Sequence, residues 1–590
     1  MKKYILYLLT GMAACGFCGC EDALDRFPKD RLTPDEFFHT EEECELYTND
    51  FYTIFPSGAS IYNETADIIT CNTLTSEVLG NRTVPATAST WKWEKLRDIN
   101  FFLQYSSNCT DDRVRFEYEG LARFFRAYFY FDKVRYYGDV PWVDRPLASD
   151  DQELYKGRDS REFVMQKVIG DLDFAIANLP AERQVYRVTR WTALALKSRA
   201  CLFEGTFRKY HSIDGYEHDW KWYLEQAADA AEEFITNSGY SLYTATGPAT
   251  SYRDLFASEN AQSVEVILAR DYNSALGVFH NANFYTISAS YGKPGMTRKI
   301  VDSYLMADGS RFTDKAGWET MEFKQQCSNR DPRLAQTIRT PGYTRIGATT
   351  KLAPDLANSI TGYHVVKFVT GTAQDAYNKS FNDLPIFRSA EVYLNFAEAK
   401  AELGTLTQED INLSVKRLRD RVGMSNLILD DANKNPDPYL SDAKTGYPNV
   451  TDANKGVILE IRRERTIELA MEGFRYYDIM RWKEGKTFEQ PLLGLYIPAK
   501  GEYDIDGDGT PDVYFATKGE TPSTTAKLTL VIDQDILFSD GDHGYISPHK
   551  NNPGIWDETR DYFYPIPTDD RSLTGGALTQ NPGWNDGLNF

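Results

Sequence analysis

The chain has 590 residues, carries 86 Asp and Glu against 65 Lys and Arg, and is 14% aromatic. This length accommodates either one large domain or several. Binding of nucleic acid depends on concentrated positive charge, so the acidic balance argues against a nucleic-acid partner. The aromatic enrichment suits a packed core as well as a stacking surface, and it does not choose between them.

Residues 1–19 have the pattern of a lipoprotein signal peptide. Lys2 and Lys3 precede an apolar run at 4–17, which is shorter than the roughly 20 residues that span a bilayer. Gly19-Cys20 then resembles a bacterial lipoprotein cleavage site, which would make Cys20 the lipidated N-terminus. Acyl chains there would anchor the protein stably to a membrane. An ordinary secretory signal is the alternative.

The remaining cysteines indicate neither a disulfide framework nor a zinc site. Their number is odd, their spacings are wide, and no CxxC pair is left among them. We expect most of them to be buried and unpaired. They are Cys44, Cys71, Cys109, Cys201 and Cys327.

Helical patterns dominate two stretches, at about 33–238 and 388–485. Thr33-Pro34 opens the first with an N-cap residue and a proline in the first turn. Six of the eight positions 124–131 are aromatic, so their helix should be buried on all sides. We expect single helices at 93–106, 116–137 and 160–179, and helix pairs at 191–205 with 222–237 and at 389–404 with 409–423.

These pairs predict a mostly α fold built on a tetratricopeptide-like scaffold of about four helix pairs. The first helix of each of the two pairs is Ala-rich and ends in Gly, which lets neighbouring helices approach closely. Residues 239–387 and 486–590 are rich in Gly and polar residues and are too long for simple loops. We therefore expect an irregular subdomain with short strands to cover the scaffold.

The chain is organised around residues 457–485. A helix predicted at 457–473 begins with an apolar stripe and then carries Glu464, Arg465, Glu468 and Glu472 on the same stripe. Buried charges must be paired and hydrogen-bonded, so we expect internal ion pairs that lock the fold. The nearby arginines are the expected partners: Arg462, Arg465, Arg475 and Arg481. Gly473 lets the chain leave the helix, and an aromatic turn follows.

No motif for catalysis is present in the sequence, which contains no P-loop, HExxH, GxSxG or dinucleotide fingerprint. The sharpest local signal is an acidic loop at 504–512. Aspartates at alternate positions followed by glycine can wrap oxygen ligands around calcium, although Phe515 stands where an EF-hand has its bidentate Glu. The predicted ligands are Asp504, Asp506, Asp508 and Asp512. An acidic turn without metal is the alternative.

Aromatic side chains in polar loops are the candidates for binding sugars. A flat ring packs against the C–H faces of a sugar, while nearby amide and charged groups bind its hydroxyls. Asn81 and Arg82 precede Trp91 in a loop rich in Thr, Ser and Pro, and Tyr285 and Tyr291 lie in another polar loop. These five are the candidate glycan-binding residues. Core packing is the alternative for each of the aromatics.

Several stretches together resemble the SusD/RagB family of outer-membrane glycan-binding lipoproteins. The resemblance covers nearly all of residues 20–590, which we read as one SusD-like domain. It rests on CEDALDRFP after the signal, LARFFRAYFYFDKVRYYGDVPWV, RWTALALKSRACLFEG, RSAEVYLNFAEAKAELG and ERTIELAMEGFRYYDIMRW.

The resemblance implies binding without catalysis, at the surface of the outer membrane. It implies delivery of oligosaccharides to a SusC-type TonB-dependent transporter as partner, with calcium as a possible cofactor. The resemblance does not identify any binding residue in this sequence. The alternatives are a surface glycoside hydrolase and a helical-repeat module that binds peptide or another nutrient.

Overall fold

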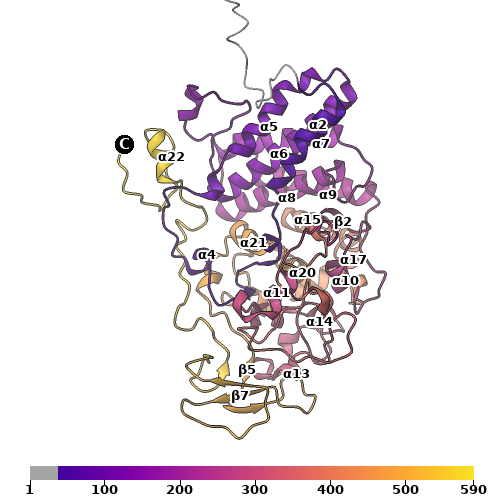
Figure 1. The fold of residues 1–590 in the computed structure, drawn as a ribbon, viewed down its shortest axis with the longest axis vertical. Coiled ribbons are helices and arrows are strands. Elements are labelled where there is room, and N and C mark those ends of the chain that lie inside the picture. The colour runs from indigo at the N-terminus through magenta and orange to yellow at the C-terminus, as the bar shows by residue number, and fades with distance from the viewer. Residues whose placement is uncertain (1–36) are drawn as a thin grey trace, which may run out of the picture.

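The computed structural model describes residues 37–590. The signal peptide, Cys20 and the helix start at Thr33 lie outside the described residues. Long helices fill one end of the molecule, short helices and loops its middle, and small sheets the opposite end (Figure 1). Within the described part, no helix is both long enough and apolar enough to cross a membrane.

The first helical stretch forms a continuous stack in which α6 packs on α7, α7 on α8 and α8 on α9. Asp111 caps α6 by accepting hydrogen bonds from the backbone N–H groups of Arg113 and Val114. The aromatic run of α6 is buried, as predicted: Phe124, Phe125, Phe129, Tyr130 and Phe131. The helices are α2 (Glu41–Thr48), α3 (Ala59–Tyr62), α4 (Ser76–Leu79), α5 (Glu94–Tyr105), α6 (Asp112–Tyr137), α7 (Arg161–Asn178), α8 (Arg190–His211) and α9 (Trp220–Asn237).

Gly205 brings α8 and α9 together but does not end α8. A Cβ at this position would lie 2.7 Å from the Leu224 Cγ of α9, so only glycine permits this close approach. The prediction of close helix contact is confirmed. The predicted end of the helix at Gly205 is wrong, because α8 continues to His211.

The second helical stretch continues the stack, with α9 against α15 and α15 against α20. The helix predicted at 409–423 is broken at Ser414, whose Oγ donates to the Asp410 carbonyl oxygen. The helix predicted at 457–473 ends at Glu468, because Met471 and Gly473 adopt positive φ angles and turn the chain. The aromatic segment after it is helical. The bounds are α15 (Ser389–Leu403), α16 (Gln408–Leu413), α17 (Val415–Arg421), α18 (Leu429–Lys434), α19 (Pro438–Ser441), α20 (Lys455–Glu468) and α21 (Arg475–Arg481).

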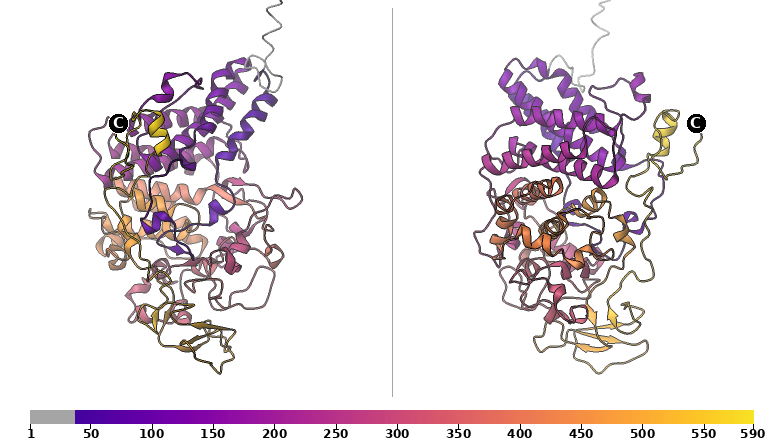
Figure 2. Two further views of the ribbon diagram at one scale, coloured as in Figure 1. Left: turned by 60° about the vertical axis from the view of Figure 1, so that its left-hand side comes forward. Right: turned by 180° about the vertical axis from the view of Figure 1, so that it is seen from behind.

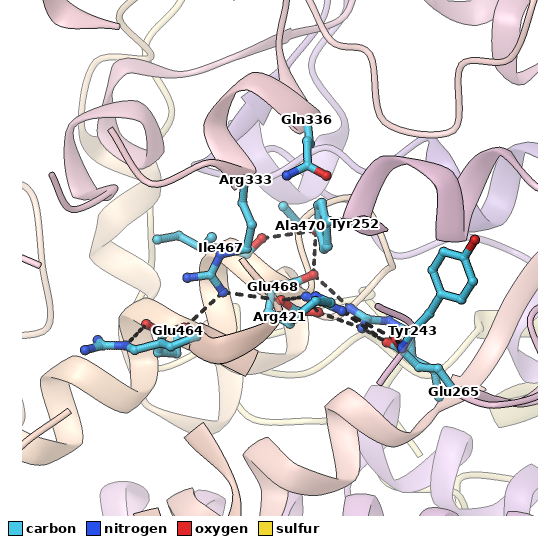
Figure 3. A network of polar contacts seen from close by, with 12 residues as sticks. Tyr243, Tyr252, Glu265, Arg333, Gln336, Arg421, Glu464, Ile467, Glu468 and Ala470 are labelled. Atoms are coloured by element: carbon cyan, nitrogen blue, oxygen red, sulfur yellow. Dashed lines mark hydrogen bonds and ion pairs between the residues drawn. The ribbon is translucent and has the colours of Figure 1, made fainter. Parts of the chain in front are cut away.

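A buried ion-pair network holds the centre of the molecule, as the charged stripe of α20 predicted. Glu468 lies between Arg333 and Arg421 (Figure 3). Its carboxylate also binds Arg388, with Nη1 to Oε1 at 2.7 Å. All four side chains are buried. Three guanidinium groups around one carboxylate lower the pKa of Glu468 well below its usual value, against the opposing effect of burial.

The partners of this network come from other elements than the sequence indicated. Glu464 binds Arg333 and Arg419, and Glu472 binds Arg388 and Lys367. The arginines predicted as partners bind other carboxylates. Arg462 pairs with Glu402, Arg465 with Asp478, Arg475 with Asp67, and Arg481 with Glu398.

The loop-rich parts contain short strands, as predicted, and wrap the lower half of the scaffold (Figure 2). Three two-stranded antiparallel pairs are β1 (Ile69–Thr70) with β3 (Gly295–Met296), β2 (Val266–Arg270) with β4 (Leu384–Arg388), and β5 (Tyr496–Ile497) with β9 (Gly544–Tyr545). A three-stranded sheet joins β6 (Gly501–Tyr503), β7 (Val513–Ala516) and β8 (Leu528–Val531). The short helices are α10 (Ser251–Ala257), α11 (Ala282–Ile287), α12 (Arg298–Ser303), α13 (Phe323–Gln326), α14 (Arg333–Thr337) and α22 (Thr568–Leu573).

The C-terminal segment returns to the N-terminal helices. The backbone N–H of Tyr564 donates to the Tyr136 carbonyl at 2.8 Å, and the amide of Asn581 donates to the Tyr137 carbonyl at 3.0 Å.

The prediction that the cysteines are unpaired and mostly buried is confirmed. All five cysteines of the described chain are free, and three are fully buried.

Candidate functional site

Arg82 and Asn81 lie where the C-terminal segment crosses the N-terminal loops. The Arg82 guanidinium is buried, pairs with Asp561 at 3.3 Å and lies over the rings of Tyr564 and Trp584. Asn81 is exposed beside it. Arg82 therefore holds the C-terminal segment in place.

Trp91 is part of the lining of a large cavity. It is 4% exposed and packs edge-on against Tyr137 and Trp93. The cavity has a volume of about 1010 Å³ and lies between the loop before α5, residues 141–156, and α22. Leu154 and Tyr155 on its lining are exposed apolar side chains. Size and lining are in the range of ligand pockets.

A second, more polar cavity of about 680 Å³ shares Ser89, Lys92 and Glu94 with the first. Its buried Lys133 donates to the carbonyl oxygens of Thr90 and Lys92. Burial lowers the pKa of Lys133 to about 8. Lys133 thus fixes the backbone on both sides of Trp91.

Tyr285 and Tyr291 belong to a different hydrophobic cluster from Trp91. Tyr285 is 2% exposed and its hydroxyl donates to Asn63 Oδ1 at 2.9 Å. Tyr291 is half-buried, with its ring centroid 6.1 Å from that of Tyr285. The structure therefore separates the candidate residues into two groups, and their role in binding stays a prediction.

Tyr291 belongs to a row of aromatic rings that reaches the surface. The Phe284 centroid lies 5.6 Å from that of Tyr291 and 5.6 Å from that of Tyr377, edge-on in both cases. Phe284 is half-buried and Tyr377 is 59% exposed. We call Phe284, Tyr291 and Tyr377 the aromatic platform.

Hydrogen bonds between two distant loops fix the platform. Asn281 Nδ2 donates to Asn378 Oδ1 at 2.7 Å, and the Asn378 backbone N–H donates back to Asn281 Oδ1. His280 and Ser380 exchange backbone hydrogen bonds beside them. Asn283 Oδ1 accepts from the backbone N–H of Thr370 at 2.9 Å. A braced platform loses little conformational freedom when a ligand binds.

Tyr377 was not among the binding residues predicted from the sequence. It lies more than eighty positions after Tyr291 in the chain, in the segment DAYNKS, and only the pairing of loops 278–284 and 377–381 brings it to Phe284. A tyrosine flanked by Asp, Ala, Asn and Lys was the available signal in the sequence. It did not indicate which other loop it would meet.

The acidic loop connects β6 to β7 at the end of the molecule that carries the sheets (Figure 1). Carboxylate oxygens of Asp504, Asp506 and Asp512 lie within 4.8 Å of one another. Asp508 is not part of this group, and its Oδ1 accepts from the Thr510 backbone N–H. Burial, followed by the like charges of Asp512, Asp508 and Asp504, raises the pKa of Asp506. A cation would relieve this repulsion, so the oxygen-only donor set fits calcium.

Two carboxyl groups of the described residues, those of Glu64 and Glu484, have pKa values raised to about 7. Glu64 and Glu484 owe the rise first to burial. Neither lines the cavities of about 1010 Å³ and 680 Å³. Their perturbed pKa values therefore do not mark an acid–base pair in a ligand pocket.

Two family models match the chain. The model described as the SusD family matches residues 255–584, and the model described as starch-binding associating with outer membrane matches residues 52–202. Among curated proteins, SusD-like protein P38 of Formosa agariphila is 23% identical over 81% of this chain and 90% of its own length. A SusD-like protein of Bacteroides ovatus is 23% identical over 99% of this chain and 98% of its own length.

Solved structures share the fold. A SusD-like protein from Bacteroides fragilis superposes with a TM-score of 0.67 at 22% identity, covering 95% of this chain and 100% of its own. A SusD-like carbohydrate binding protein from the same species gives a TM-score of 0.66 at 20% identity, covering 91% of this chain and 99% of its own. At these identities the similarity establishes the fold.

Proposed function

Because the chain belongs to the SusD family, we propose that it binds glycan oligosaccharides without cleaving them. One structural neighbour is named a carbohydrate binding protein, and the second family model is described as starch-binding. Both names support a sugar as the class of ligand. The absence of a recognised catalytic motif in the sequence agrees with a binding role.

The aromatic platform is the observation that carries the proposal. Tyr377 exposes more than half of its surface, although a buried location would be more favourable for a ring of this size. Exposed aromatic groups on a rigid support are suited to stack on the apolar face of a sugar ring. The exposed Asn378 and Lys379 supply polar groups for its hydroxyls.

We also propose that the protein is anchored at the surface of the outer membrane by lipid on Cys20. There it would pass its ligand to a SusC-type TonB-dependent transporter. The signal-like sequence before Cys20 and the outer-membrane description of the second family model support this location. The transporter as partner follows from the family resemblance.

We propose calcium for the acidic loop. Asp504, Asp506 and Asp512 would supply the ligand oxygens, because their carboxylates converge. Asp504 also accepts hydrogen bonds from the backbone N–H groups of Gly507, Asp508 and Gly509, which fix its orientation. The ion would neutralise the charge of the loop and hold the β6–β7 connection.

The test of glycan binding is calorimetry on the form that starts at residue 21, with plant, host and microbial oligosaccharides. We expect Tyr377→Ala to weaken binding at least tenfold, which corresponds to about 1.4 kcal/mol. The matched control is Tyr216→Ala, an exposed tyrosine on a different loop. Tyr155→Ala tests the large cavity.

Three outcomes contradict parts of the proposal. Loss of binding with Tyr155→Ala and not with Tyr377→Ala would move the site to the large cavity. Release of shortened oligosaccharides by the purified protein would establish a glycoside hydrolase. No binding by any oligosaccharide, together with binding of peptides, would overturn the sugar as ligand.

A further inference from the structure

A small cavity of about 210 Å³ lies next to the aromatic platform and contains none of its residues. It lies among Asn72, Lys293, residues 356–360, and the turn after β8. Lys293 follows Tyr291 by two positions, and the Asn72 backbone N–H donates to the Gly292 carbonyl at 2.7 Å. The same short stretch of chain therefore contributes to the platform and to the cavity.

The polar side chains of this cavity have unused hydrogen-bonding capacity. Ser359 is 1% exposed, and its Oγ has no hydrogen-bond partner in the part of the chain that the structure describes. A buried unpaired polar group costs about 1–3 kcal/mol. The side chains of Asn72, Lys293 and Gln534 likewise make no hydrogen bond or ion pair to residues 37–590. These four groups are available to a ligand.

The backbone of Lys293 adds a second, independent observation. Its φ of 51° lies in the left-handed region, which is uncommon for a residue other than glycine. The Ile360 backbone N–H holds it there by donating to the Lys293 carbonyl at 3.0 Å. Strained residues of this kind concentrate where a side chain must be presented to a ligand.

Size and charge define the ligand. The volume of about 210 Å³ is below the roughly 300–1,000 Å³ of pockets for drug-sized ligands, so it suits a ligand as small as one sugar ring. Lys293 and Asp535 carry opposite charges, so the lining is neutral overall. Leu356, Ile536 and Ile546 form a buried apolar wall. Amide, hydroxyl and charged groups above an apolar wall match a molecule with hydroxyls on one side and C–H groups on the other.

We propose that this cavity is a second carbohydrate subsite, which takes one neutral sugar unit beside the platform. The proposal rests on the proposed function for the class of ligand, but its site and residues are separate. A glycan chain seated on Tyr291 would enter the cavity at Lys293. Asn72 and Gln534 at the rim and Ser359 inside would bind its hydroxyls.

The test is saturation-transfer NMR with the methyl glycosides of glucose, galactose, mannose and xylose. The Tyr377→Ala protein is the background, because we expect this substitution to weaken binding at the platform. Asn72→Ala/Gln534→Ala is added to it to remove two exposed rim groups, which leaves the buried core unchanged. The matched control is Gln184→Ala/Asn260→Ala, which removes an exposed amide pair elsewhere.

We expect at least one glycoside to receive saturation in the background and in the control, and to lose it in the cavity variant. No transfer to any glycoside, or transfer that persists in the cavity variant, would overturn the proposal. Free alanine is included as a zwitterionic probe. Transfer to alanine but to no glycoside would assign the cavity to zwitterions and overturn the proposal as well. Failure of the proposed function is a different result, because it is read from oligosaccharide calorimetry on the otherwise unchanged protein.

Discussion

Replacement of Glu468 by glutamine tests the buried network directly. The carboxylate accepts from Arg388 Nη1 at 2.7 Å, from Arg421 Nη2 at 2.5 Å and from Arg333 Nη1 at 3.3 Å. An amide keeps one acceptor oxygen and directs an NH₂ group at guanidinium donors. Glu265, at 3.4 Å, would be the only charged partner left to Arg421 among the described residues. Removing one partner of a buried charge cluster costs about 3–5 kcal/mol.

The assay is urea unfolding followed by tryptophan fluorescence, which gives the free energy of unfolding. Asp420→Asn is the control, because it makes the same chemical change in an exposed pair with Lys416. Exposed pairs contribute about 0–1 kcal/mol. If Glu468→Gln lowers the free energy of unfolding by no more than Asp420→Asn does, the network does not stabilise the fold and the prediction is wrong. The contribution of Glu468 to the free energy of unfolding should be fully present above pH 4.5. It should disappear as the pH falls further, because folding lowers the pKa of this carboxyl group.

Three further predictions follow from single sites. The pKa of Glu64 rises from 4.5 to about 7 on folding, so this group should reduce stability as the pH rises from 4.5 to 7. Glu64→Gln should raise the free energy of unfolding by up to about 3 kcal/mol at pH 8 and by less than about 1 kcal/mol at pH 5, as measured by urea unfolding, and an equal effect at both pH values would contradict this. EDTA should lower the melting temperature of the wild type and not of Asp506→Asn; an unchanged curve with no calcium by elemental analysis would remove the metal. Gly205→Ala should destabilise by about 1–2 kcal/mol through its contact with Leu224, whereas Gly170→Ala, with open space at its Cβ, should not.

The sequence determined the helical scaffold because helix formation is local. The aromatic run of α6, the cap at Gly138 and the Ala-rich faces of α8 and α15 fix helices and buried faces within a few turns. The charged stripe of α20 required buried partners whatever the fold, since unpaired charges are too costly inside a protein. Burial of Glu464, Glu468 and Glu472 could therefore be predicted from the sequence.

The identity of those partners depended on tertiary structure. Arg333, Arg388 and Arg421 come from three elements far from α20 in the chain, and no local spacing relates them to it. The nearby Arg475 and Arg481 point to other carboxylates, because α21 starts after a chain reversal at Met471 and Gly473.

The candidate site also combines features that local sequence signals predict with features that only long-range contacts determine. The sequence singled out Tyr291 by its polar loop and the aspartates by their spacing, both of which are local signals. It could not distinguish Trp91, which is buried in the lining of a cavity, from Tyr377, which is exposed at the surface, because exposure depends on which loops meet. Pairing of the loop around Asn281 with the loop around Asn378 is a long-range contact, and only the folded chain decides it.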